Sequence, residues 1–154
     1  IPMKKIKIYL KSILLPLILG GLVGFLTSKS MDYKDLVQPP LAPPSILFPI
    51  VWSILYLLMG ISYGRLEEQL KNDMEVDKIY SLQLVINLLW PIFFFVLKWR
   101  LFAFFWLLLL IYLVIKMIKT FYQQDKLAGL LQLPYLLWCL FASYLNLSIY
   151  LLNK

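Results

Sequence analysis

The sequence predicts an all-α integral membrane protein, a bundle of five transmembrane helices. Five apolar blocks alternate with short charged patches, at residues 6–27, 45–64, 79–97, 101–120 and 128–151. A helix of about 20 residues, rising ~1.5 Å per residue, crosses the ~30 Å hydrocarbon core of a bilayer. Only helices or closed barrels satisfy every backbone polar group there. The blocks lack the two-residue alternation of barrel strands and are too long for them, which favours helices.

Composition supports a single membrane domain, which we place at residues 3–154. The chain has 154 residues, of which 62% are hydrophobic and 15% are charged. Five spans and their connections leave no room for a soluble domain. Histidine is absent and Cys139 is the single cysteine, so we expect no metal site, no disulfide framework and no histidine-based catalysis.

The net charge of +7 fits membrane topology better than nucleic-acid binding, and we expect no nucleic-acid partner. With an odd number of spans, ten Lys and Arg residues fall on the side of the N-terminus and five on the other side. Cytoplasmic loops carry the excess of basic residues. This bias predicts a cytoplasmic N-terminus.

The first block is long and lacks a small-x-small cleavage site, which favours a span over a signal peptide. The connection after it contains four prolines within residues 39–44. Prolines favour a stiff extended segment, which is either a lid over the bundle or a spacer.

The remaining connections are shorter. Residues 65–78 carry charges of both signs and predict a solvated turn. The third connection, 98–100, is a tight hairpin that makes the third and fourth spans antiparallel neighbours. The fourth, 123–126, is also short.

All eight carboxylates are expected in the connections and none in a span. They are Asp32, Asp35, Glu67, Glu68, Asp73, Glu75, Asp77 and Asp125. Proton-coupled transporters usually need an ionisable group at membrane depth. The distribution therefore argues against ion-coupled transport and against paired-carboxylate catalysis inside the bilayer.

Aromatic rings and amides instead follow one face of three predicted spans. The faces consist of Trp52, Tyr56, Met59 and Tyr63; of Gln83, Asn87, Trp90 and Phe94; and of Tyr135, Trp138, Ala142 and Asn146. Residues three or four apart share a helix face. Such faces could line one apolar pocket, with Asn87 and Asn146 orienting a flat ligand. The alternative is that the rings pack the bundle and the amides bind neighbouring helices.

Two GxxxG pairs permit close helix approach, Gly20 with Gly24 and Gly60 with Gly64. The approach is either within the bundle or between subunits.

Three segments carry a familiar order of motifs. They read PPLAPPSILFPIVWSILYLLMG at 39–60, NLLWPIFFF at 87–95 and LPYLLWCLFASYLNLSIYLLN at 133–153. With them the chain resembles the translocator protein family, also called tryptophan-rich sensory proteins or TspO/MBR. The family's motifs are K-P-x-W-x-P-P followed by F-x-x-V-W-x-x-L-Y-x-x-M-G, then N-x-x-W-x-x-x-F-F, then P-Y-x-x-W-x-x-F-A-x-x-L-N-x-x-I-x-x-x-N. The order, spacing and span count agree along essentially the whole chain.

The sequence departs from the family pattern at four positions. Leu41 replaces the tryptophan of the proline loop, and Gln38 replaces the lysine before it. Asp32 stands where an aromatic residue often precedes Tyr33, and Pro91 stands where a small residue commonly follows the third-span tryptophan. The loop is thus less aromatic than is usual in the family.

The resemblance implies a five-helix fold, often a homodimer, with a ligand pocket under the first loop. It implies binding of porphyrins such as protoporphyrin IX and heme, or of similar flat apolar molecules, with lipid as the surroundings. The porphyrin is the ligand, and no cofactor is required. The implied pocket residues are Trp52, Asn87, Trp138, Ala142, Tyr33, Tyr56 and Phe94. The aromatic faces add Trp90, Tyr135 and Asn146 as candidate ligand-binding residues.

Trp52 and Trp138 match the tryptophans tied to light-dependent porphyrin breakdown in some bacterial members, which makes them the candidate catalytic residues. Indoles can stack on a porphyrin face and exchange an electron with the excited ring. The porphyrin's propionates would have to reach the wet end of the bundle, near Lys29 or Lys34.

The resemblance therefore implies a porphyrin-binding membrane receptor or sensor, with or without photo-oxidative turnover. The alternatives are a non-catalytic transporter of tetrapyrroles or lipids, and a membrane scaffold without a ligand. The expected location is a bacterial plasma membrane.

Overall fold

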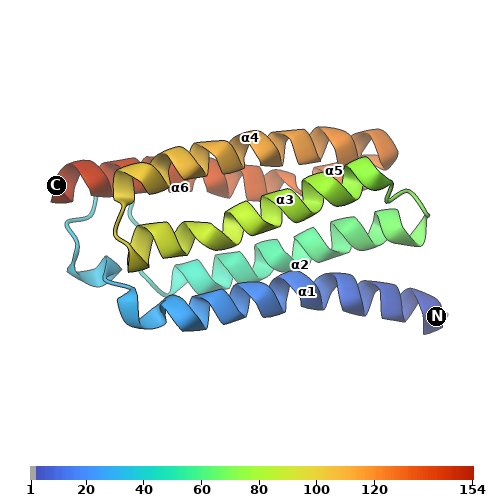
Figure 1. The fold of residues 1–154 in the computed structure, drawn as a ribbon, viewed down its shortest axis with the longest axis horizontal. Helices are drawn as coiled ribbons and strands as arrows, with labels where there is room; N and C mark the ends of the chain where they lie inside the picture. The colour runs from blue at the N-terminus through green and yellow to red at the C-terminus, as the bar shows by residue number, and fades with distance from the viewer. Residues whose placement is uncertain (1–2) are drawn as a thin grey trace.

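A computed structural model describes residues 3–154 as a bundle of long helices lying side by side (Figure 1). The helices are α1 (Met3–Thr27), α2 (Leu47–Glu68), α3 (Met74–Pro91), α4 (Arg100–Gln124), α5 (Lys126–Leu130) and α6 (Leu133–Asn153). Two short 3₁₀ turns, Ser28–Ser30 and Tyr33–Asp35, lie in the first connection, and a π-helical turn, Ile92–Val96, continues α3. The ends of the chain lie at opposite ends of the bundle (Figure 1).

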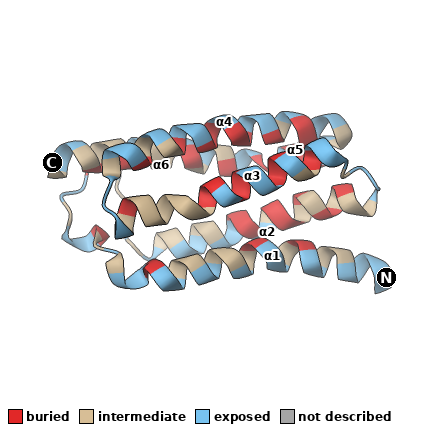
Figure 2. Ribbon diagram, in the orientation of Figure 1, coloured by how far each residue is buried: buried red, intermediate tan, exposed pale blue. Residues whose placement is uncertain are grey.

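Five helical segments are long and apolar enough to cross a membrane. They are Met3–Ser30, Leu47–Glu68, Met74–Val96, Arg100–Gln124 and Lys126–Asn153. Each overlaps one predicted block, so the predicted all-α bundle with five spans is confirmed. Large apolar side chains such as Phe25 and Leu137, 75% and 66% exposed, point away from the interior. Exposed positions recur along every long helix (Figure 2), as expected for a protein surrounded by lipid.

The fifth span contains a short break that the sequence analysis did not foresee. α5 ends at Leu130 and α6 begins at Leu133. Pro134, in the first turn of α6, has no N–H to donate to the carbonyl of Leu130. Proline is well suited to a first helical turn, where that N–H has no helical partner. The break therefore falls just before the proline.

The prediction that every carboxylate lies in a connection was wrong for four residues. Glu67 and Glu68 belong to the last turn of α2, and Glu75 and Asp77 to the first turn of α3. The helices extend past their apolar blocks, because polar residues also support helix ends at the membrane surface. Acidic residues in a first turn also interact favourably with the helix dipole.

The interior holds two apolar clusters. The larger one includes Met59, Val114 and Phe121, all 0% exposed. The smaller one lies where the first connection covers the bundle, and it contains Tyr33, Phe94, Ala103, Leu145 and Ile149. α1 packs along α2, while α4 packs against both α3 and α6. The predicted antiparallel pairing of the third and fourth spans is confirmed.

Candidate functional site

A chain of hydrogen bonds joins three helices in the bundle interior. The hydroxyl of Tyr56 on α2 donates to Oδ1 of Asn87 on α3 at 2.7 Å. Nδ2 of Asn87 donates to the Tyr135 hydroxyl on α6 at 2.6 Å, and that hydroxyl donates to Oε1 of Gln83 at 2.8 Å. Asn87 is 3% exposed and Tyr135 is 1% exposed. Because each group meets its hydrogen-bonding needs inside the protein, the chain orients all three helices.

Trp52 lies directly beside this chain. Its ring centroid is 5.6 Å from that of Tyr56 and 6.3 Å from that of Tyr135, the latter in an edge-on arrangement. The indole is only half-buried. Trp52 therefore contacts the polar chain and still offers ring surface to another molecule.

Trp138 on α6 stands closer to the loop end. Its ring lies 5.9 Å from Phe48 and 5.5 Å from Phe141. Its Nε1 is buried and has no hydrogen-bond partner within residues 3–154. A buried N–H without a partner costs free energy unless another group supplies an acceptor. Ala142, one helical turn onward, is partly buried beside the larger cluster.

An open hollow of about 390 Å³ lies beside Trp138, between α2 and α6. Its lining consists of Val51, Ile54, Leu55, Pro134, Leu137, Trp138 and Phe141. The lining is almost wholly apolar, and Ile54 and Leu137 are exposed at its edge. The hollow therefore opens sideways, toward the acyl chains of the bilayer.

Trp90, Phe94 and Asn146 form a second group. The rings of Trp90 and Phe94 stack at 4.8 Å, and Nε1 of Trp90 donates to Oδ1 of Asn146 at 3.0 Å. Nδ2 of Asn146 donates to the carbonyl oxygen of Arg100 at 2.8 Å. Since the Asn146 amide is engaged on both sides, it ties α3, α4 and α6 together at the loop end.

Tyr33 connects the loop to the bundle. The side chain is 6% exposed, and its ring packs edge-on to Phe48 at 4.9 Å. Its hydroxyl donates to the Pro43 carbonyl at 2.6 Å, and its carbonyl accepts from the Gln38 side chain at 2.9 Å. Burial raises the pKa of the Tyr33 hydroxyl above its ordinary value, which keeps the donor protonated. Through Phe48, Tyr33 is linked to Trp138.

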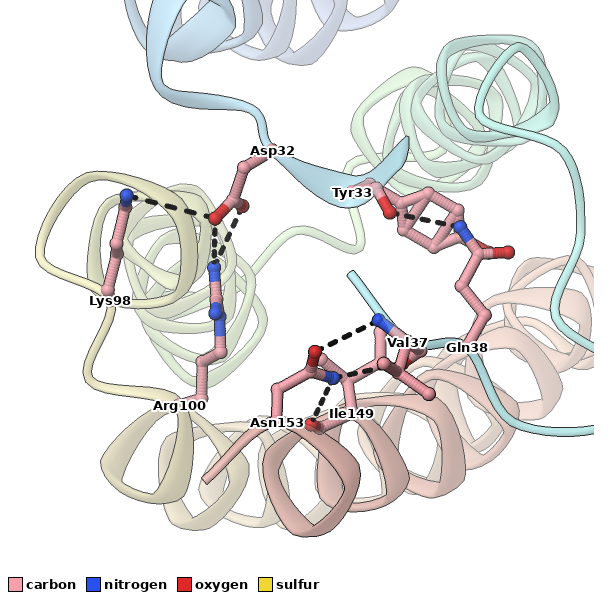
Figure 3. A network of polar contacts seen from close by, with 8 residues as sticks. All are labelled: Asp32, Tyr33, Val37, Gln38, Lys98, Arg100, Ile149 and Asn153. Atoms are coloured by element: carbon pink, nitrogen blue, oxygen red, sulfur yellow. Dashed lines mark hydrogen bonds and ion pairs between the residues drawn. The ribbon is translucent and has the colours of Figure 1, made fainter. Parts of the chain in front are cut away.

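Further contacts anchor the loop at several points (Figure 3). Both carboxylate oxygens of Asp32 accept from Nη2 of Arg100, at 2.7 and 2.8 Å. The backbone N–H of Val37 donates to Oδ1 of Asn153 at 2.9 Å, and Nδ2 of Asn153 donates back to the Val37 carbonyl at 2.9 Å. The Tyr144 hydroxyl donates to the Pro40 carbonyl at 2.6 Å. The first connection is thus a fastened cover over one end of the bundle.

The structure brings the candidate residues together in part. One group shares contacts in the middle of the bundle and consists of Trp52, Tyr56, Asn87 and Tyr135. The remaining candidates lie nearer the loop; they are Tyr33, Trp90, Phe94, Trp138, Ala142 and Asn146. Their role in ligand binding and catalysis stays a prediction.

Sequence reasoning assigned no role to Asp32, Arg100 or Asn153. One signal could have found the first two. Asp32 and Arg100 belong to the first and third predicted connections, which lie on the same side of the membrane because successive spans cross it in alternating directions.

These features define a helical membrane protein of five spans, with an aromatic interior under a proline-rich cover. The chain belongs to the TspO/MBR family, whose family model matches residues 12–152. It is 41% identical to "Tryptophan-rich protein TspO" of Archaeoglobus fulgidus, across 92% of this chain and 94% of that protein. It is 36% identical to "Protein CrtK" of Rhodobacter capsulatus, across 87% and 86%. It is 30% identical to "Translocator protein" of Bos taurus, across 83% and 80%.

Proposed function

We propose that this protein is a membrane receptor or sensor for porphyrins and similar flat apolar molecules. The ligand would bind among Trp52, Asn87 and Trp138, below the cover of residues 28–46. The observation that carries the proposal is the meeting of aromatic rings from α2, α3 and α6 around a few buried polar groups. Apolar pockets with few, well-placed polar groups are typical of small-molecule sites. The name of the bovine relative, "Translocator protein", agrees with the binding of a small molecule.

Two features of the interior suit a planar guest. The half-buried indoles of Trp52 and Trp138 have free ring surface for stacking, and the partnerless Nε1 of Trp138 can donate to a polar atom of the ligand. The lateral hollow between α2 and α6 offers a molecule dissolved in the bilayer a route to the Trp138 indole, which lines it. A lipid-soluble ligand need not cross the water phase to arrive there.

Binding is tested by titrating the detergent-solubilised protein with protoporphyrin IX and following the Soret band. We expect saturable binding and a higher melting temperature, because a ligand that binds only the folded state stabilises it. Trp138→Phe should weaken binding by about 1 kcal/mol, roughly fivefold in Kd. Trp106→Phe is the control, since the Trp106 indole donates to the Ile86 carbonyl between α4 and α3 and lies outside the candidate site. Absence of both the spectral change and the thermal shift would contradict the proposal and favour a scaffold without a ligand.

Illumination separates a catalytic role from binding alone. With dioxygen as the oxidant, photo-oxidative breakdown would remove the Soret band in the light, and Trp52→Phe and Trp138→Phe would slow that loss. Stable binding without loss of the band in the light would favour a sensor or a transporter of tetrapyrroles.

We also propose a location in a bacterial plasma membrane. The charge distribution supports a cytoplasmic N-terminus, and cysteine labelling from either side of the membrane tests this orientation. A homodimer is also proposed, from the resemblance, and sedimentation in detergent tests it.

A further inference from the structure

The ion pair between Asp32 and Arg100 uses only one nitrogen of the guanidinium group. Both oxygens of the Asp32 carboxylate bind the same nitrogen of Arg100, Nη2. The neighbouring Nε of Arg100 is buried and has no partner within residues 3–154. A guanidinium binds a carboxylate best through two of its nitrogens at once, with two parallel hydrogen bonds. Asp32 thus leaves one of the two best donors of Arg100 unused.

The surroundings of Arg100 fix its position next to the candidate site. Its guanidinium carbon lies 5.2 Å from the ring centroid of Phe94, and its carbonyl oxygen accepts from Asn146. Its side chain is only 12% exposed. Lys98 adds a second positive charge, with Nζ at 3.8 Å from the Asp32 carboxylate. Two cations therefore face a single carboxylate, and the net charge of the cluster is positive.

Asp32 can leave this cluster without releasing the cover. Within residues 3–154, the carboxylate is held by Arg100 and Lys98. The rest of the segment is anchored independently by the packing of the Tyr33 ring on Phe48, and by the hydrogen bonds of Asn153 and Tyr144. Figure 3 shows Asp32 directed toward Arg100 and Lys98, and the anchors of Tyr33 and Asn153 at separate places. Rotation of one side chain would free the guanidinium.

We propose that Arg100 and Lys98 form a subsite for a ligand carboxylate, and that Asp32 occupies this subsite until the ligand displaces it. The inference rests on the proposed function and adds the residues that would receive the carboxylate side chains of the flat apolar ring. The incoming carboxylate gains the Nε and Nη2 donors together, whereas Asp32 reaches Nη2 alone. Asp32 acts as an internal competitor, so the site discriminates acids from neutral molecules of the same shape. The sequence had pointed to Lys29 and Lys34 for this contact, and that expectation stays a prediction.

The experiment compares protoporphyrin IX, which has two carboxylates, with its uncharged dimethyl ester. Arg100→Gln should weaken binding of the diacid about tenfold or more and leave ester binding unchanged, because only the diacid uses the charge-assisted contact. Asp32→Asn should strengthen diacid binding severalfold, again without an effect on the ester. Lys71→Gln removes an exposed positive charge from the connection between α2 and α3, at the other end of the bundle, and serves as the control, with both ligands binding as in the wild type.

The remaining outcomes are equally decisive. If Asp32→Asn weakens binding of both ligands, the ion pair acts as a latch for the cover, and the competitor proposal is overturned. If Arg100→Gln weakens both ligands equally, the variant has disturbed the fold and not a subsite, and the proposal is likewise overturned. If diacid and ester bind all variants alike, the subsite is absent although the proposed function stands. If neither ligand binds the wild type, the proposed function itself fails.

Discussion

Gly60 of α2 lies against the backbone of α1 at Ser12. A Cβ atom placed on Gly60 would stand 2.5 Å from the Ser12 carbonyl oxygen and 2.5 Å from the Ile13 Cα. Real Cβ atoms do not approach backbone atoms so closely. Gly64, one turn onward, lies against the side chains of Tyr9 and Ser12. This GxxxG pair is therefore used within the chain, to pack α1 onto α2.

Gly60→Ala should accordingly loosen the α1–α2 contact. The added methyl group forces two helix backbones apart, at a cost of about 1–3 kcal/mol. Gly24→Ala is the matched control, because no atom outside its own helical turn lies within 4 Å of a Cβ there. Thermal unfolding in detergent should show a lower midpoint for the first variant only. Equal midpoints for the two variants would contradict the close approach.

The polar chain through Asn87 predicts a coupled pair of substitutions. Asn87→Leu leaves the Tyr56 hydroxyl buried without its acceptor and should cost about 1–3 kcal/mol of unfolding free energy. Tyr56→Phe removes that hydroxyl, so the double variant should be more stable than the sum of the single changes predicts, by about 1 kcal/mol. Tyr112→Phe, at a position 61% exposed, should be additive with Asn87→Leu. Additivity of Tyr56→Phe as well would contradict the hydrogen bond.

Much of this architecture could be predicted from the sequence, because lipid imposes strong constraints. The length of an apolar block determines whether a helix can span the membrane. The spacing of three and four residues along the helix faces identified Trp52, Tyr56, Asn87 and Tyr135 as candidates for one pocket. The break between α5 and α6 escaped prediction because an apolar composition continues across it. Only Pro134 marked it, and proline is also tolerated within membrane helices.

The fastening of the loop could not be predicted in the same way. Asp32 and Arg100 are 68 residues apart, and Val37 and Asn153 are 116 apart. Such pairs depend on how helix ends meet in space, which periodicity does not report. Asp32 also stands at a position where the resemblance led us to expect an aromatic residue.

The anchor between Asn153 and Val37 predicts the mobility of the cover. Asn153→Ala removes both hydrogen bonds to the Val37 backbone, so amide hydrogen exchange across residues 33–44 should accelerate. Exchange in the middle of α2 and α4 should not change. Lys154→Ala, at the adjacent exposed residue, is the control. Unaltered exchange across 33–44 in the Asn153 variant would mean that the remaining anchors hold the cover unaided.

The ion pair at the opposite end of the bundle predicts a pH dependence. Nε of Arg65 donates to Oδ2 of Asp125 at 2.7 Å, and this hydrogen bond holds the pKa of the Asp125 carboxyl below its ordinary value of 3.8. A lowered pKa in the folded state stabilises the fold above the ordinary value, and the contribution is lost as the pH falls through the folded pKa. The contribution is therefore complete above about pH 5 and is lost in more acidic solution.

Asp125→Asn isolates this effect, since asparagine can still accept the hydrogen bond from the Ala128 N–H at the start of α5. The variant should melt at a lower temperature than the wild type at neutral pH, and the difference should shrink on acidification. Asp35→Asn, at an exposed position, is the control and should leave the pH profile as it is. A difference for Asp125→Asn that is constant across the pH range would contradict the role of the charge.

The central claim is that indoles from α2 and α6 enclose a planar guest. It is tested most directly by ¹⁹F NMR of protein labelled with 5-fluorotryptophan and titrated with protoporphyrin IX. The ring current of a porphyrin shifts nuclei close to its plane, and Trp→Phe variants assign the five tryptophan signals. We expect the signals of Trp52 and Trp138 to shift with saturation, while that of Trp106 stays in place. A shift confined to Trp106, or no saturable shift at all, would contradict the account.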